Sequence, residues 1–270
     1  MTDALQVKGL IKSYGSVEVL KGIDFTVRQG EIFALLGVNG AGKTTALECI
    51  EGLRSYDGGE ITVNGRIGIQ LQSATLQAYI RVYEAINLFA KWNGVTPDRE
   101  ILRSLGIDEL AKKRYADLST GQKRRLHLAL ALIGDPQIVF LDEPTAGLDV
   151  EGKVSLHEQI RALKAHGKTV ILASHDMAEV EELCDRIAIL KDGKIAFIGT
   201  IGQLTEAVGR QYTVQITTAL GKDSFDTSNL TDTLLEKVRE YRERGVEITD
   251  IRTDRGTLEQ HFIHIAREGR

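Results

Sequence analysis

The sequence predicts an α/β fold built on a parallel sheet, and three stretches of the chain support this. Residues 138–141 and 169–173 are continuous apolar runs, which are typical of strands buried on both faces of a parallel sheet. Residues 32–36 form another short apolar run, and a glycine-rich loop and a helical pattern follow it. Ligands bind at the carboxyl ends of the strands in such sheets. We therefore expect the functional residues directly after these three runs.

The loop from Gly37 to Thr44 reads Gly-Val-Asn-Gly-Ala-Gly-Lys-Thr and fits the pattern G-x-x-x-x-G-K-[ST]. Its glycines allow the backbone to curl so that several N–H groups point at one anion, backed by the positive end of a helix expected over 44–53. Lys43 adds a full charge for terminal phosphates, and the Thr44 hydroxyl can bind a magnesium ion. A glycine-rich turn that arose by chance is the alternative, which the flanking strand and helix disfavour. The loop predicts a nucleotide-phosphate site.

Polar side chains end the other two runs. Asp142 and Glu143 follow 138–141, and because neighbouring strand residues point to opposite sides, one carboxylate can face a metal ion and the other water. His175 follows 169–173 at the same edge of the predicted sheet and is the only one of 6 histidines so placed. A pair of solvated loop acids is the alternative for Asp142 and Glu143, and the nearby phosphate loop disfavours it.

Two further features are ambiguous when taken alone. Tyr14 lies in a turn between the alternating, antiparallel strands expected within 3–28, where it either stacks on a nucleotide base or packs at a strand end. Ser119 is a good N-cap for a helix over 123–133, and the residues after it add backbone donors. That helix end is a second place where an anion could bind, although most serine N-caps only cap a helix.

The bulk composition excludes several classes of protein. The chain has 270 residues, of which 42% are hydrophobic and 27% charged, as in ordinary globular proteins. A net charge of −4 argues against a basic nucleic-acid surface, although not against a local basic patch. No apolar run approaches the roughly 20 residues of a membrane-spanning helix, and the N-terminus has no signal segment. We expect the 2 cysteines to be reduced core thiols.

The remaining elements are expected as follows. Residues 60–63 and 66–69 read as a hairpin around Asn64-Gly65, and 79–133 turn helical, with Trp92 capping the core of that subdomain. Residues 177–184 form a short helix whose acidic residues Glu179, Glu181 and Glu182 suggest a solvated face, and His157 reads as a helix-face residue. A strand–helix–strand–helix pattern over 212–217, 230–244, 246–251 and 257–266 predicts a small accessory domain from about 210.

The order of these motifs resembles that of an ATP-binding cassette (ABC) ATPase over roughly residues 3 to 204. The ordered set is the phosphate loop, Gln72, Leu118-Ser119-Thr120-Gly121-Gln122, Leu141-Asp142-Glu143-Pro144, Gly147-Leu148-Asp149 and Ser174-His175-Asp176. The resemblance implies a P-loop NTPase with a RecA-like parallel core sheet, an N-terminal antiparallel β subdomain and a helical subdomain over about 73–135. The ATPase domain would span 1–204, and a small α+β extension would span 210–270.

The resemblance also assigns roles to individual residues. The nucleotide would be bound by Tyr14 on adenine and, around the phosphates, by Gly37, Asn39, Gly40, Ala41, Gly42, Lys43, Thr44 and Thr45. The metal-site residues would be Thr44, Gln72 and Asp142, which implies ATP and Mg²⁺ as the bound groups. The catalytic residues would be Glu143 as general base, His175 on the γ-phosphate and Gln72 near the attacking water. The chain departs from the common pattern at Val38, Thr120 and the Gln70-Leu71 pair before Gln72.

The resemblance further implies that the active unit is a dimer. Ser119 and Gly121 would bind the γ-phosphate of a nucleotide held by the opposite subunit, and Asp149 would lie at the dimer seam. This explains a second anion-binding helix end that has no use within one copy. Two cassettes must then face each other head to tail around a two-fold axis, with two ATP molecules between them.

Within the family, the single cassette and the tail ending Gly256-Thr257-Leu258-Glu259-Gln260-His261-Phe262 are similar to ATP-binding subunits of bacterial multidrug- or antibiotic-type exporters. Such a subunit would drive separate transmembrane permease subunits, and we expect it to be cytoplasmic and peripheral on the inner face of the membrane. The alternative is an ABC ATPase that acts on ribosomes or DNA, which the acidic composition and the single cassette disfavour. No nucleic-acid partner is expected.

Overall fold

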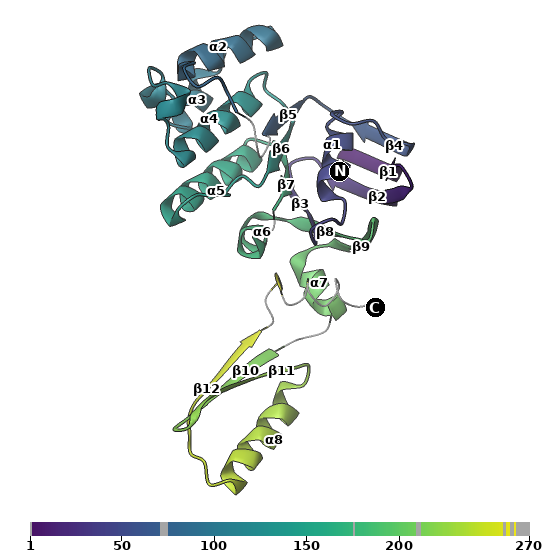
Figure 1. Ribbon diagram of the computed structural model, residues 1–270, viewed down its shortest axis with the longest axis vertical. Helices are drawn as coiled ribbons and strands as arrows, with labels where there is room; N and C mark the ends of the chain where they lie inside the picture. The colour runs from purple at the N-terminus through teal and green to yellow at the C-terminus, as the bar shows by residue number, and fades with distance from the viewer. Residues whose placement is uncertain are drawn as a thin grey trace. The chain divides into compact units, whose positions relative to one another are not determined.

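The computed structural model describes residues 2–70, 75–174, 176–208, 212–255, 258, 259 and 262. The chain divides into two compact units, Met1–Ile198 and Gly199–Arg270 (Figure 1). The first unit contains two sheets and the second unit contains one. The division falls six residues before the end predicted for the ATPase domain, so α7 (Ile201–Val208) belongs to the second unit.

A six-stranded sheet forms the centre of the first unit, in the order β5-β6-β7-β3-β8-β9. Its strands are β3 (Ile32–Gly37), β5 (Ile67–Gln70), β6 (Ile138–Asp142), β7 (Thr169–Ala173), β8 (Arg186–Lys191) and β9 (Lys194–Gly199). Neighbouring strands from β5 to β8 pair in parallel. All five residues of β7 are buried, as the continuous apolar run predicts for a strand covered on both faces. The predicted α/β fold with a parallel core sheet is confirmed.

A second, antiparallel sheet has the order β2-β1-β4, with β1 (Asp3–Tyr14), β2 (Val17–Arg28) and β4 (Gly58–Val63). The predicted hairpin of 60–63 with 66–69 is wrong, because β4 pairs with β1 while β5 pairs in parallel with β6. The turn at Asn64-Gly65 carries the chain from one sheet to the other. Arg66 is tied to the start of β6, where its N–H donates to Gln137 Oε1 at 2.8 Å. A turn motif determines only that the chain reverses direction locally. Which strands then pair depends on contacts between distant parts of the chain.

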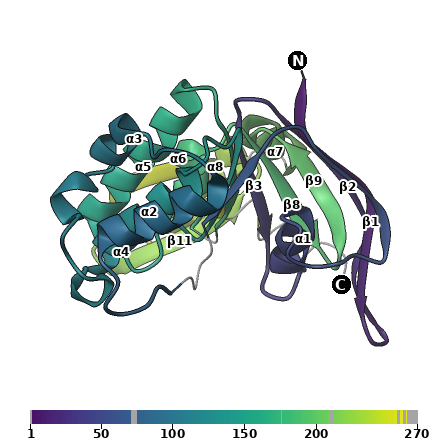
Figure 2. The ribbon, with the colours of Figure 1, turned by 90° about the horizontal axis from the view of Figure 1, so that it is seen from above.

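The helices of the first unit are α1 (Lys43–Ile50), α2 (Val82–Asn93), α3 (Arg99–Ser104), α4 (Thr120–Leu132), α5 (Val150–Ala165) and α6 (Met177–Leu183). In both Figure 1 and Figure 2, α2, α3 and α4 gather on one side of the central sheet and β1 and β2 on the other, and Figure 1 shows β4 beside β1. Trp92 does not cap the helical core, since 72% of its surface is exposed. The buried positions Val82, Ile86 and Ala90 repeat every four residues, so Trp92 falls on the outer face of α2.

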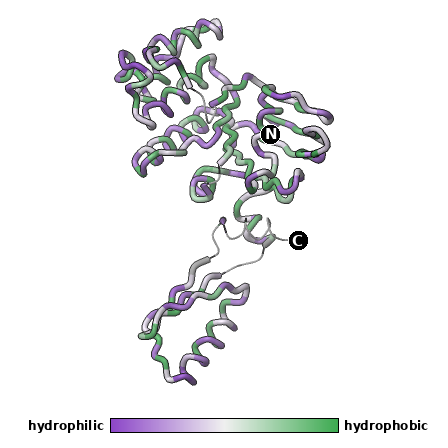
Figure 3. The backbone as a smooth tube through the Cα atoms, viewed as in Figure 1, coloured by the Kyte–Doolittle hydropathy of each residue, from purple (hydrophilic) through white to green (hydrophobic). Residues whose placement is uncertain are grey.

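The main core lies between the two sheets and α1. Figure 3 shows hydrophobic residues concentrated along the central strands. Phe33 and Phe140 are the largest fully buried side chains of the core cluster, and Phe33 stacks on Phe25 with ring centroids 5.7 Å apart. This packing fixes the carboxyl ends of β3 and β6, which carry the loops predicted to bind nucleotide.

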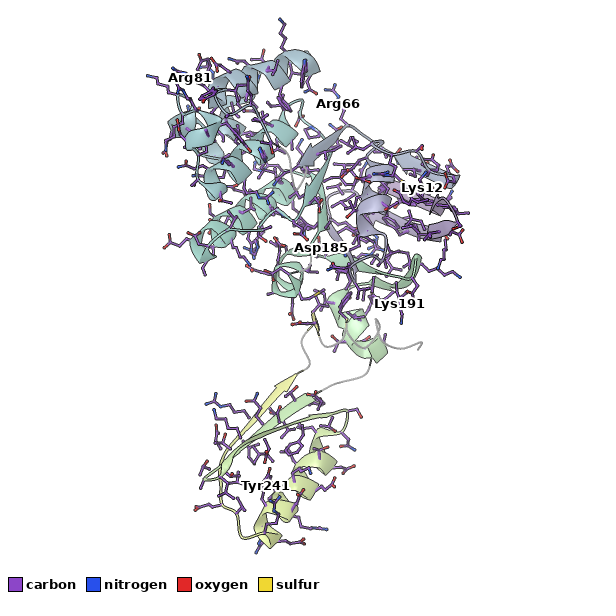
Figure 4. All side chains as sticks on the ribbon, in the orientation of Figure 1. Lys12, Arg66, Arg81, Asp185, Lys191 and Tyr241 are labelled. Carbon is purple, nitrogen blue, oxygen red and sulfur yellow. The ribbon has the colours of Figure 1, made fainter. Side chains whose placement is uncertain are left out.

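The second unit contains the antiparallel sheet β11-β10-β12 with β10 (Tyr212–Thr218), β11 (Gly221–Thr227) and β12 (Ile248–Arg255), and the helix α8 (Leu230–Glu243). Val214, Ile216 and Tyr241 form its small core, and Figure 4 shows Tyr241 on α8. Strand β11 was not predicted, because Gly221–Thr227 is polar apart from Phe225. The helix predicted over 257–266 lies largely outside the described residues.

Candidate nucleotide-binding site

The glycine-rich loop joins β3 to α1 with the backbone geometry that phosphate binding requires. Gly42 is the N-cap of α1 at φ 104°, and no side chain caps the helix, so its first N–H groups remain available to an anion. A Cβ on Gly42 would lie 2.9 Å from Leu20 Cδ2, and one on Gly37 would lie 2.5 Å from the Leu190 carbonyl oxygen. Glycine is therefore required at Gly37 by the close backbone carbonyl, and at Gly42 by the left-handed backbone.

Lys43 lies folded over this loop. Its Nζ donates to the carbonyl oxygens of Gly37 at 2.6 Å and Val38 at 3.3 Å. Burial lowers the pKa of Lys43, and the charges of Glu143 and Asp142 oppose that shift. The ammonium group is thus partly removed from water and held by neutral carbonyls, which makes an incoming phosphate a better partner than the present ones.

The two carboxylates at the end of β6 sit opposite the loop. Burial raises the pKa of Asp142, Glu143 raises it further, and Arg124 and Lys43 act in the other direction. A partly buried carboxylate beside a second carboxylate is stabilised by a divalent cation, so Asp142 fits the magnesium site predicted for it. Glu143 adopts φ 45°, uncommon for a residue with a side chain, and its N–H donates to the Ala173 carbonyl at 2.8 Å. This backbone turns Glu143 away from the strand direction of Asp142.

One cavity of about 470 Å³ joins the loop to the ends of β6 and β7. It is lined by Val19, Asn39, Gly40, Gly42, Lys43, Thr44, Thr45, Asp142, Glu143, Ala173 and Ser174. Phosphate-binding and carboxylate residues predicted from separate stretches of sequence therefore share one pocket. Thr44 and Asp142 both line it, as oxygen ligands of a hydrated magnesium ion would.

Six predicted nucleotide-binding residues do not line this cavity. Gly37 and Ala41 belong to the loop itself, and Tyr14 ends β1. The other three are Ser119, Gly121 and Asp149. Ser119 is exposed at the N-cap of α4, where its hydroxyl accepts from the Gln122 N–H at 3.3 Å. Gly121 lies beside Leu148, since a Cβ on it would be 3.7 Å from Leu148 Cδ2. Asp149 is exposed and caps α5 by accepting from the Gly152 N–H at 2.8 Å. Ser119, Gly121 and Asp149 thus belong to a separate surface of the same chain.

Tyr14 ends β1 and is 42% exposed, between the cations of Lys12 and Arg54, which lie 5.7 and 5.4 Å from its ring centroid. It also does not line the cavity. An exposed ring with cations on it is available for stacking, so its predicted contact with a base stays a prediction.

Gln72 and His175 lie outside the described residues. Gln70 is described, and no sequence pattern indicated its environment. It ends β5 with 1% of its surface exposed, and neither polar atom of its amide has a hydrogen-bond partner among the described residues. Its register partner is Leu141, the neighbour of Asp142.

Glu51, directly after α1, is a further acid that the sequence pattern did not indicate. Burial raises its pKa to about 7, and the charges of Asp142 and Glu48 contribute in the same direction. Ionised Glu51 is therefore unfavourable in the folded chain. Below about pH 4.5, the ordinary pKa of a glutamate, the carboxyl is mainly protonated in both the folded and the unfolded chain. The free energy of unfolding is then at its full value as far as Glu51 is concerned, and it falls as the pH rises through 7.

We expect Glu51→Gln to stabilise the protein at pH 8 by about 1 kcal/mol, or roughly 2–4 °C in Tm, after allowance for partial exposure. The gain should shrink at pH 5, where the folded state holds Glu51 neutral. Thermal unfolding at both pH values measures it. Glu181→Gln, an exposed acid-to-amide change on α6, is the control. An equal gain at pH 5 and pH 8 would show that the Glu51 charge is not the cause.

These features define a P-loop nucleotide-binding protein. The family model described as ABC transporter matches residues 20–146. The linearmycin resistance ATP-binding protein LnrL of Bacillus subtilis (strain 168) is 36% identical over 239 residues, which is 82% of this chain and 77% of that protein. The Nod factor export ATP-binding protein I of Rhizobium meliloti (strain 1021) is 42% identical over 72% of this chain and 64% of that protein.

Solved structures of ATP-binding subunits and cassettes of ABC transporters have a similar fold. An ATP binding subunit of an ABC transporter superposes with TM-score 0.70 and 28% identity, over 76% of this chain and 92% of that one. A nucleotide-free ATP-binding cassette from an ABC transporter, 22% identical, shares the fold with TM-score 0.67, over 74% of this chain and 92% of that one. The chain belongs to the ABC transporter family, as one of its ATP-binding proteins.

Membership confirms the central expectations. The chain is an ATP-binding subunit of an ABC transporter that binds ATP with Mg²⁺ and hydrolyses ATP to drive transport. ATP-binding subunits of this kind act with membrane partners and as dimers. Nothing in the comparisons supports the alternative of a ribosome- or DNA-acting ATPase. Across the described residues, every helix is too short or too polar to cross a membrane.

Proposed function

We propose that this chain is the ATPase of an exporter, that it pairs with a second copy of itself, and that it docks on separate permease subunits at the inner face of the membrane. The relatives named for linearmycin resistance and Nod factor export support the export direction. The chain spans 64% of the length of that Nod factor protein. Purification of the tagged chain from detergent-solubilised membranes, followed by identification of the bound membrane protein, tests this partner. Recovery of ribosomes or DNA in its place would contradict it.

The first unit carries the proposed catalytic residues, and we propose 1–204 as the ATPase domain and 210–270 as an accessory domain. Lys43 and the loop N–H groups bind the phosphates, and Thr44 and Asp142 hold the metal. When bound, Mg²⁺ neutralises phosphate charge and orients the terminal group. Glu143 polarises the attacking water as general base. We propose that Gln72 contacts that water, His175 the γ-phosphate and Tyr14 the adenine.

The observation that carries the dimer proposal is the separation of two anion-binding helix ends. The N-terminus of α1 opens into the cavity, whereas Ser119, at the N-terminus of α4, is exposed and does not line it. No acidic residue lies in the first turn of α4, and Lys123 and Arg124 follow. A positive helix end facing solvent is complementary to a phosphate presented by another molecule. The Ser119, Gly121 and Asp149 surface therefore completes the pocket of the partner copy.

We expect Ser119→Arg to keep ATP binding by the monomer and to abolish ATP-dependent dimerisation, because the long side chain fills the space of the second phosphate contact. Light scattering with a slowly hydrolysed ATP analogue measures the dimer, and fluorescent-nucleotide titration measures binding. Ser104→Arg, an equal change at an exposed serine of α3, should still dimerise. A Ser119→Arg protein that dimerises as the unchanged chain does would refute the contact.

A further inference from the structure

A buried carboxylate reaches the wall of the nucleotide cavity from α6. The prediction of a solvated acidic face is wrong for Glu179, because only 2% of its surface is exposed. Its Oε2 accepts from the Ser174 hydroxyl at 2.5 Å. Ser174 is itself 4% exposed and lines the cavity. A hydroxyl in the pocket wall is thus held by a buried carboxyl group behind it.

His157 connects that carboxylate to α5. Its Nδ1 lies 3.0 Å from Glu182 Oε2, and its Nε2 lies 3.6 Å from Glu179 Oε1. Within the part of the chain that the structure describes, neither His157 Nε2 nor Glu179 Oε1 has a hydrogen-bond partner, so these two buried atoms have mainly each other. The ring therefore lies between the two carboxyl groups, with one nitrogen facing each of them. His157, predicted to lie on a helix face, is instead a buried link between two helices.

The same network holds both neighbours of position 175. The Asp176 N–H donates to Ser174 Oγ at 3.1 Å, and Asp176 Oδ1 accepts from the Glu179 N–H at 3.3 Å. Asp176 Oδ2 pairs with Lys153 of α5 at 2.7 Å. Ser174 and Asp176 are therefore both held by side chains of α5 and α6, and not by the sheet alone.

Helix α5 is itself held at both ends. Asp149 caps its first turn, and near its last turn Lys164 pairs with Asp185 at 2.5 Å. Asp185, labelled in Figure 4, directly precedes β8 and accepts from the Ile32 N–H at the start of β3. Helix α5, which carries Lys153 and His157, is thus anchored near both of its ends.

We propose that His157 and Glu179 are positioning residues for ATP hydrolysis, which hold Ser174 in the wall of the nucleotide cavity. The proposal rests on the catalytic site described above and concerns no new chemical step. Its physical basis is that small displacements of groups facing the reacting atoms lower turnover steeply while ground-state binding changes little.

Glu179→Leu and Glu179→Gln in the full-length chain separate positioning from simple packing. Leucine fills a similar volume but cannot hold Ser174 or His157, so we expect kcat for ATP to fall by about 10-fold or more, with KM within about 3-fold. The amide of glutamine accepts from Ser174 and can donate to a neutral His157, so we expect it to restore kcat to within about 3-fold of the unchanged chain.

The matched control is Ile160→Ala, which truncates a fully buried side chain on α5, the helix that carries His157, and leaves the polar network intact. It should lower Tm at least as much as Glu179→Leu while kcat at 25 °C stays unchanged. If kcat falls equally in both variants, the effect of Glu179 is only structural and the proposal is overturned.

A double-mutant cycle tests the path to Ser174. Ser174→Ala and Glu179→Leu break the same bond, so the double variant should be no slower than the slower single variant. If the reductions in kcat of the two single variants multiply in the double variant, the two residues act separately, which would overturn the proposed link between Glu179 and Ser174. His157→Leu should likewise lower kcat, and unchanged turnover in that variant would remove His157 from the network. The unchanged chain is assayed first: no ATP hydrolysis there would contradict the proposed function, whereas normal hydrolysis with unaffected variants contradicts only this inference.

Discussion

Replacement of Glu143 by glutamine is expected to lower ATP turnover by about 10²–10⁴-fold, the usual contribution of a positioned general base. Glutamine keeps the shape of the side chain but cannot accept the proton of the attacking water. ATP binding should persist, because Lys43 and the loop N–H groups are untouched. The variant should therefore accumulate as an ATP-bound dimer. Steady-state phosphate release and size-exclusion chromatography with ATP measure the two effects.

The control for this variant is Glu151→Gln, an acid-to-amide change at an exposed position in the first turn of α5. It should leave turnover within about 2-fold of the unchanged chain, as is usual for exposed sites away from a reacting group. Near-normal hydrolysis by Glu143→Gln would remove Glu143 from the role of base.

Replacement of Lys43 by alanine is expected to weaken ATP binding by about 2–5 kcal/mol, which is roughly 30-fold to several thousand-fold in Kd. The Lys43 ammonium group donates to two loop carbonyls. Its positive charge also interacts with the charges of Glu143 and Asp142. Removal of the lysine therefore leaves negative charge dominant in the cavity. The negative charge of the carboxylates would then repel the phosphates of ATP. Fluorescent-nucleotide titration measures Kd.

Lys194→Ala, at an exposed position of β9, should bind ATP as the unchanged chain does. Thermal unfolding of Lys43→Ala without nucleotide should give a Tm close to that of the unchanged chain, because the hydrogen bonds of the lysine side chain within the described residues are the two to loop carbonyls. Retained ATP affinity in a folded Lys43→Ala protein would contradict the phosphate-binding role.

Local patterns in the sequence determined the elements that form the nucleotide cavity. The loop from Gly37 to Thr44 follows β3, and the runs 138–141 and 169–173 form β6 and β7. Their ends could be placed together in advance because parallel strands share a carboxyl edge. Ser119 could be recognised as an N-cap from local pattern too, since capping depends on neighbours within three residues.

Contacts between distant segments decided what the sequence did not show. The strand partner of β5, the exposure of Trp92 and the raised pKa of Glu51 all depend on which surface each element meets.

Glu179 is the clearest example of a residue whose burial the sequence did not show. Its short acidic helix reads as solvated, yet α5 and the end of β7 cover it and supply His157 and Ser174 as partners. The sequence by itself therefore determined the family, the cavity and its phosphate loop, because these depend on short-range patterns. Only the tertiary structure decided which charges are buried behind that cavity, because burial is a property of packing between segments far apart in the chain.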